Sequence, residues 1–178
     1  MTTEKTVWKL DPAHSEITFK VKHMMISNVK GAFNMFQAEI QGEDFTKSKI
    51  TVDINAASID TNSPDRDAHL KSADFFDTEN YPTLHFESTS FTKVKGDEYE
   101  LKGFLTMKGV RNEVTLEVEF GGINKDPWGH EKAGFSVEGK INRKDWGLNW
   151  NAALETGGVL VSDEVRLQAD IQFVKQTV

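Results

Sequence analysis

The chain of 178 residues contains no cysteine, so neither disulfide bonds nor thiol chemistry are available to it. Basic residues are outnumbered by acidic ones, and a net charge of −7 argues against binding to a nucleic-acid backbone, which needs clustered lysine and arginine. No stretch is apolar for long enough to span a membrane, and the first residues show no signal peptide. We therefore expect a cytoplasmic protein, or a periplasmic or secreted one only if a signal was removed.

What the sequence does have is alternation of apolar and polar residues, which is typical of β-strands with one buried face. Ile17, Phe19 and Val21, for example, share one face of such a segment. The alternation predicts strands over residues 6–10, 16–23, 29–42, 49–57, 84–88, 99–107, 113–120, 133–141 and 165–173.

Two segments depart from simple alternation. Phe33, Met35 and Phe36 cannot all face the same way in one strand, so a bulge is expected near residues 34–36. Residues 121–129 include a proline and several glycines, which predicts a loop.

About eight long strands, each with one apolar face, must cover that face by stacking two sheets or by closing a barrel. Strands of about 10 residues, rising ~3.3 Å each and tilted by ~40°, would build a wall about 25 Å tall, which favours the barrel. We expect an all-β, antiparallel, eight-stranded, lipocalin-like barrel that forms one domain over residues 1–178. An interior of this size is filled by side chains or holds one small ligand. Glycines inside predicted strands would bend the wall or leave interior space: Gly31, Gly103, Gly134 and Gly139.

Residues 58–82 interrupt the strands with a helical pattern. Ser63 can cap a helix, Pro64 suits its first position, and Asp65 suits the positive end of its dipole. Arg66 and His69 follow at a spacing that places them on one face. The sequence therefore predicts a short helix that covers one mouth of the barrel.

Motifs in nearly every part of the chain resemble those of the YceI-like family and come in the same order. They are residues 8–15 (WKLDPAHS), Phe19, His23, and residues 29–33 (VKGAF), 58–61 (SIDT), 66–70 (RDAHL), 74–77 (DFFD), 81–82 (YP), 103–110 (GFLTMKGV), 134–135 (GF) and 143–147 (RKDWG). The resemblance implies a lipocalin-like barrel that binds a polyisoprenoid or related amphiphilic lipid, often as a dimer and in many members in the periplasm. The chain departs from the family in lacking a signal peptide and in having Arg111 where threonine is expected.

The inward residues are the candidates for binding a lipid tail, although they could equally pack against each other and fill the barrel. His23 continues an inward row and could bind a head group, or it could be a core histidine bonded to backbone. Arg66, Asp67 and His69 could form a polar end to the cavity, or make only a helix cap and a surface ion pair. The full set of expected ligand-binding residues is Phe19, Val21, His23, Phe33, Phe36, Arg66, His69, Phe76, Phe86, Leu105, Met107, Phe135 and Trp150.

Other polar groups carry no clear chemistry. The five histidines lack the spacing of common metal pairs, and no nucleophile motif or phosphate loop is present, so we expect no metal, no cofactor and no catalytic residue. Arg143, Asp145 and Asn149 are expected to pin the loop around Trp146 by ion pairing.

Three functions remain open. The favoured one is a protein that binds, stores or transports an isoprenoid or fatty amphiphile. The alternatives are a barrel with a filled core that acts as a protein-interaction or stress-related scaffold and, less favoured, an enzyme that modifies a lipid. A homodimer is expected because the family resemblance suggests one. Trp128, Trp146 and Trp150 support it, since they fall outside the inward rows and could form an interface, although they could instead seal a mouth.

Overall fold

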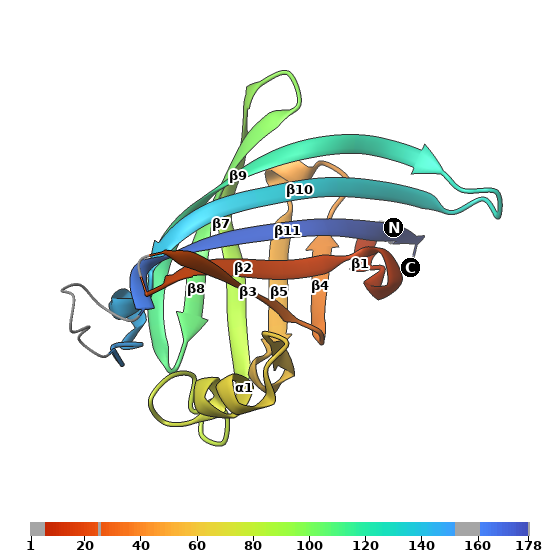
Figure 1. The fold of residues 1–178 in the computed structure, drawn as a ribbon. Helices are drawn as coiled ribbons and strands as arrows, with labels where there is room; N and C mark the ends of the chain where they lie inside the picture. Colours follow the sequence, from red (N-terminus) through yellow and green to blue (C-terminus); the bar gives the residue numbers. More distant parts are fainter. Residues whose placement is uncertain (1–5, 25, 152–160, 178) are drawn as a thin grey trace.

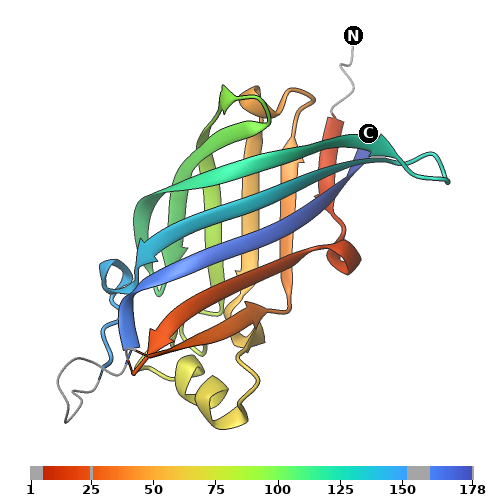
Figure 2. The same ribbon diagram turned by 45° about the horizontal axis from the view of Figure 1, so that its top comes forward.

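A computed structural model describes residues 6–24, 26–151 and 161–177, and it shows an antiparallel sheet rolled into a barrel with one helix across an end (Figures 1 and 2). Short 3₁₀ turns lie at Pro12–His14, Phe45–Lys47, Ala56–Ser58 and Arg143–Trp146. The helix is α1 (Pro64–Lys71), and the strands are β1 (Thr6–Leu10), β2 (Glu16–His23), β3 (Ser27–Phe33), β4 (Phe36–Gln41), β5 (Lys49–Asn55), β6 (Ile59–Asp60), β7 (Thr83–Lys95), β8 (Glu98–Met107), β9 (Val110–Lys125), β10 (Glu131–Asn142) and β11 (Val161–Thr177).

The eleven labelled strands form eight strands of the barrel, because three of the eight are interrupted and each of these is labelled as two strands. β1 and β2 both pair with β11, on either side of a 3₁₀ turn. β3 pairs with β2 while β4 pairs with β1, and likewise β6 pairs with β3 while β5 pairs with β4. The pairing of β1 with β11 closes the sheet. The predicted eight-stranded antiparallel barrel is therefore confirmed.

The break between β3 and β4 lies where the sequence predicts a bulge. Asn34 donates its backbone N–H to Ser58 O at 3.2 Å, and Met35 O accepts from Asn55 N at 2.9 Å, so both residues leave the ladder of β1 and β2. Met35 turns outward and is 62% exposed, whereas Phe33 is buried. The two-residue break thus lets both Phe33 and Phe36 pack against the core.

The predicted loop at 121–129 is wrong in most of its length, because β9 continues to Lys125 and pairs with β10. The register shifts between Gly134 and Phe135, so the glycines that suggest a loop form a bulge instead. Only a tight turn remains, in which Asp126 Oδ1 accepts the N–H groups of Trp128 and His130, both at 2.9 Å. The hairpin projects beyond the barrel wall (Figure 2).

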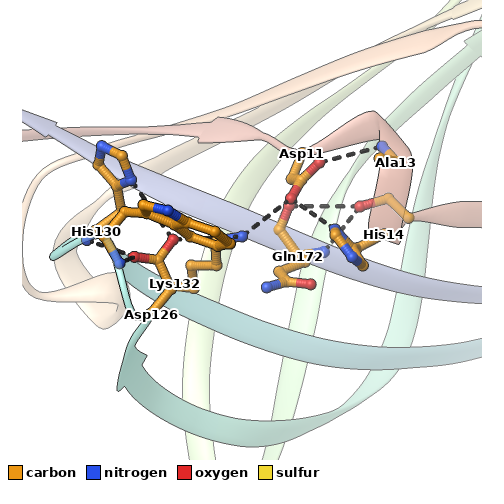
Figure 3. Close-up of polar contacts among 9 residues, drawn as sticks. Asp11, Ala13, His14, Asp126, His130, Lys132 and Gln172 are labelled. Atoms are coloured by element: carbon orange, nitrogen blue, oxygen red, sulfur yellow. Dashed lines mark hydrogen bonds and ion pairs between the residues drawn. The ribbon is translucent and has the colours of Figure 1, made fainter.

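A cluster of charged residues ties this hairpin to the 3₁₀ turn that follows β1. Lys132 Nζ lies 3.4 Å from Asp11 Oδ2 and 3.8 Å from Asp126 Oδ2 (Figure 3). His14 Nδ1 approaches Asp11 at 2.9 Å, and His130 Nδ1 approaches Asp126 at 3.5 Å. The cluster therefore links the β9–β10 hairpin to the segment between β1 and β2.

Helix α1 begins as the sequence predicts. Ser63 has extended backbone angles and its Oγ accepts the Arg66 N–H at 3.4 Å, with Pro64 in the first turn. None of the helix residues is fully buried, but Leu70 packs against the core. Figures 1 and 2 show it lying across one end of the barrel, as predicted.

Candidate functional site

The barrel interior is not filled: it contains a cavity of about 510 Å³. Its wall is made by the inward rows of the strands, because alternate side chains of a strand point to the same face. The cavity touches every residue that the sequence predicts to bind ligand except Phe36, which packs against the core from outside the lining. Those that line it are Phe19, Val21, His23, Phe33, Arg66, His69, Phe76, Phe86, Leu105, Met107, Phe135 and Trp150.

Three glycines make room for the rings and branched chains that form the wall. A Cβ at Gly103 would lie 2.6 Å from the ring of Phe86, and a Cβ at Gly31 would overlap the ring of Phe19. Gly139 lies in the same way beneath Leu116. These inward side chains can therefore lie flat along the wall instead of crossing the interior, which keeps the cavity open.

The polar lining gathers at the end covered by α1. Lys22 and His23 come from the end of β2, Asp65 and Arg66 from the first turn of α1, and His69 from its last turn. The other lining residues are apolar, except for Thr61, Arg143 and Gln168. The site therefore has an apolar chamber and a polar mouth.

Arg66 is held at the mouth by the segment that precedes the helix. Its Nε donates to Thr61 Oγ1 at 2.8 Å, and its Nη2 donates to Thr61 O at 2.7 Å. Thr61 is itself fixed, because its N–H donates to Asp67 Oδ1 at 2.8 Å. Within the described part of the chain no carboxylate forms an ion pair with Arg66. The guanidinium therefore presents a positive charge and unused donors to the mouth.

His69 closes the other side of the mouth. Its Nε2 lies 2.9 Å from Asp74 Oδ2, and its ring meets Trp150 edge to face at a centroid distance of 4.5 Å. Phe75 contacts both rings, at 5.1 Å from His69 and 5.5 Å from Trp150. Phe75, which follows the helix, thus holds α1 against the segment that follows β10.

Arg143 anchors that segment, but not in the way the sequence predicts. It is only 3% exposed, and its guanidinium donates to the carbonyls of Leu148 (2.6 Å), Trp150 (2.9 Å) and Ser162 (2.9 Å). Burial lowers the pKa of Arg143, and the charge of Asp163 opposes that shift. Arg143 pins the loop mainly by hydrogen bonds to backbone carbonyls, and its ion-pair partner is Asp163, at 3.9 Å, instead of the expected Asp145.

The three tryptophans lie outside the strands, as the sequence predicts, but Trp146 is buried. It is 2% exposed, and its Nε1 donates to Leu105 O at 2.8 Å. Trp150 lines the cavity, and Trp128 alone of the three is strongly exposed, at 80%. Strand alternation could not reveal this, because Trp146 lies in a 3₁₀ turn that folds back over β8.

Several lining residues are not among those predicted from the sequence. Phe75 and Leu148 are buried at the mouth, and Lys22 reaches it although it belongs to an outward row. The paired aromatics at Phe75 and Phe76 were the available signal for the first of these. No signal in the local pattern indicates the other two.

The histidines are not gathered into a metal site in the part of the chain that the structure describes. Across the described ranges no group of three or more His, Asp, Glu or Cys residues is placed to hold an ion. His85 Nδ1 instead lies 2.6 Å from Asp53 Oδ1 on the neighbouring strand, and His14, His69 and His130 each have an aspartate partner.

No helix in the described part of the chain is long and apolar enough to cross a bilayer.

An eight-stranded antiparallel barrel with an apolar chamber and one polar mouth defines a lipocalin-like binding barrel. Comparison with known proteins makes this class more specific. The YceI-like domain model matches residues 8–173, so the chain belongs to the YceI-like family.

Individual proteins are similar to this chain over nearly its whole length. A UPF0312 protein of Staphylococcus aureus (strain N315) is 43% identical over 171 residues, covering 94% of this chain and 97% of its own. The crystal structure of a Campylobacter jejuni YceI protein has a TM-score of 0.73 and 35% identity, covering 93% of this chain and 95% of that one. A polyisoprenoid-binding domain from Saccharophagus degradans shares the fold with a TM-score of 0.66 at 15% identity, covering 94% and 97%.

Proposed function

We propose that this protein binds an isoprenoid or another amphiphilic lipid, with the tail in the barrel and the head at the mouth beside α1. The observation that carries the proposal is the apolar cavity of about 510 Å³ that ends in a polar mouth. Small-molecule sites commonly measure ~300–1,000 Å³ and combine apolar walls with a few polar groups. The similarity in fold to a polyisoprenoid-binding domain supports the same ligand class.

The chamber would supply most of the affinity. Each buried CH₂ contributes about 0.8 kcal/mol, so a tail of about ten carbons would gain on the order of 8 kcal/mol before the cost of ordering it. Met107 lies among the lining residues, and its flexible side chain suits chains of irregular shape. The polar groups would then set the orientation of the lipid more than its affinity.

The mouth would select the head group. Arg66 offers a positive charge with free donors, and Lys22 and His69 lie in the same rim. An anionic or hydrogen-bonding head group would find partners there, whereas a hydrocarbon would find none. Storage and transport both follow from reversible binding of this kind.

The direct test is native mass spectrometry of protein purified without detergent, followed by extraction of any bound mass. We expect a lipid-sized adduct, or uptake of one when a fluorescent fatty acid or isoprenoid is added. Leu105→Trp and Phe135→Trp should fill the chamber and reduce uptake, while Val94→Trp, at a position 63% exposed, should not. Failure of the parent protein to take up any amphiphile would refute the proposal.

The same experiment separates the alternatives. A scaffold with a filled core would carry no extractable lipid, and its tryptophan variants would unfold instead of losing uptake, since overpacking a tight core costs ~1–3 kcal/mol. An enzyme would release a lipid of altered mass. We propose a binding protein and not an enzyme, since the lining offers an apolar chamber and the family relatives include a binding domain.

Assembly remains a separate proposal. We propose a homodimer from the family resemblance, with Trp128 as the remaining candidate contact because it is 80% exposed. Sedimentation velocity over a hundredfold dilution of the parent and of Trp128→Ala tests this. A single monomer species at the highest concentration would exclude the dimer.

A further inference from the structure

A row of four basic residues crosses the outer wall of the barrel at one level. The ladders place Lys140 opposite Arg166, Arg166 opposite Lys20, and Lys20 opposite Lys30. They stand on β10, β11, β2 and β3, which lie side by side in both ribbon views (Figures 1 and 2). Because neighbouring strands are ~4.8 Å apart, the row spans only about 15 Å.

Repulsion between the four positive charges destabilises the fold, and few ion pairs offset that repulsion. Like charges placed directly opposite each other on adjacent strands repel. Among the described residues Lys20, Lys30 and Lys140 form no ion pair, and Arg166 Nε comes only to 4.0 Å from Glu164 Oε2. The protein as a whole has a net charge of −7, so the row forms a positively charged patch on a negatively charged protein.

Protection of an exposed strand edge against pairing with another chain explains at most one of the four basic residues. Lysine on an edge strand discourages pairing with another chain, and Ser27–Gly31 of β3 has no second strand partner among the described residues. That accounts for Lys30. Lys20 and Arg166 lie on strands paired on both sides, where no such protection is needed.

Exposed apolar side chains lie at the end of the same wall. In the turn between β2 and β3, Met24 is 45% exposed and Ile26 is 85% exposed. The residue just before this turn, His23, lines the cavity, as does Lys22. The apolar tip therefore lies at the rim of the mouth, beyond the level of the basic row.

We propose that this wall docks the protein on an anionic lipid bilayer, with the row of Lys20, Lys30, Lys140 and Arg166 at the head groups and Ile26 inserted at the interface. A bilayer is the occupant that satisfies both features, since basic residues are attracted to an anionic surface and an apolar tip partitions into its interface. Docking in this way brings the mouth to the membrane. The inference stands on the outer wall alone and does not depend on occupancy of the cavity.

Vesicle co-sedimentation tests the inference. The protein should pellet with vesicles of phosphatidylcholine and phosphatidylglycerol at low salt, and should stay in solution with phosphatidylcholine alone or at high salt. Each lysine near the surface is worth about fivefold in the partition coefficient, so Lys20→Gln with Lys30→Gln should lower it about 25-fold. Ile26→Ser should weaken the binding that survives added salt.

Lys93→Gln with Lys95→Gln is the matched control, because it removes the same charge from exposed positions on β7. It should retain nearly all the binding. The Lys20 and Lys30 variant should also fold at least as stably as the parent, since it removes a repulsion. A cavity-filling Leu105→Trp variant should still dock, which separates this inference from the proposed lipid binding.

Absence of pelleting with the anionic vesicles at low salt would overturn the inference, as would an equal loss in the two double variants. Binding to a single-stranded oligonucleotide with no binding to vesicles would overturn it as well, because it would assign the row to a soluble polyanion.

Discussion

The ring of Phe19 covers Gly31, its partner directly across the ladder of β2 and β3, so closely that a Cβ on Gly31 would overlap it. Glycine at this position lets the ring lie flat on the wall. The pair thereby contributes both to the integrity of an edge strand and to the volume of the chamber.

Gly31→Ala should force Phe19 off the wall and toward the cavity. We expect a loss of about 1–3 kcal/mol in the free energy of unfolding from overpacking, together with weaker uptake of a fluorescent lipid. Gly134→Ala is the control, because a Cβ there meets nothing within 4 Å and its φ is not positive. Urea denaturation and a binding titration check both variants, and equal behaviour would show that the ring can move without cost.

Arg66→Ala with His69→Ala should change which lipids bind more than how well the chamber binds. Both side chains line the mouth, and neither extends the apolar wall beyond it. Affinity for a fatty acid should fall several-fold, while affinity for a hydrocarbon of the same length should not. Titrating the fatty acid and the hydrocarbon into the variant measures both affinities. An equal loss of affinity for the two ligands would show that Arg66 and His69 do not bind the head group.

Ser63→Ala should remove the cap of α1 and cost about 1 kcal/mol of stability. The Ser63 Oγ accepts the N–H of Arg66, and an alanine leaves that donor at the helix start without its partner. Thermal denaturation measures the change. Ser90→Ala serves as the control, since no side-chain hydrogen bond of Ser90 is found over the described ranges, and a similar cost there would argue against the cap.

Arg143→Lys should destabilise the protein strongly although the charge is kept. A lysine presents a single ammonium in place of the planar fork that reaches the carbonyls of Leu148, Trp150 and Ser162. Leaving buried carbonyls without donors costs roughly 1–3 kcal/mol each, so we expect a loss of at least about 2 kcal/mol. Arg166→Lys, on the exposed outer wall, should be nearly neutral by the same urea titration.

Stability should fall in acid partly through Asp11. Burial raises the pKa of this carboxyl, but hydrogen bonds from His14, Ala13 N–H and Lys132 outweigh burial and hold the pKa below its ordinary range. A lowered folded-state pKa stabilises the protein above the unfolded value of about 3.9, and that stabilisation is lost as pH falls through the folded value.

Asp11→Asn should therefore reduce stability at pH 7 and flatten its decline below about pH 4. Urea midpoints measured from neutral pH into that acid range will show this. Asp97→Asn, in the exposed β7–β8 turn, provides the comparison. An unchanged slope in Asp11→Asn would mean that the cluster around Lys132 does not contribute to acid sensitivity.

Much of the fold follows from local pattern. Alternation identified the inward rows, because side chains on a strand point to one face at every second residue. Ser63 and Pro64 identified the start of α1, because capping depends on residues within one turn. The break at Asn34 and Met35 was also foreseeable, since Phe33 and Phe36 conflict in an uninterrupted strand.

The tertiary structure decided the features that depend on residues far apart in the chain. β9 extends through two glycines only because β10 pairs with it, and Trp146 is buried only because its indole reaches Leu105 O. The basic row follows the same rule, since Lys20, Lys140 and Arg166 become neighbours only in the registers of the closed barrel. The sequence by itself determined which face of the sheet most strand side chains take, because that depends on strand alternation alone. Strand registers and loop packing join residues that are far apart in the chain, so only the tertiary structure decided which side chains each face contacts.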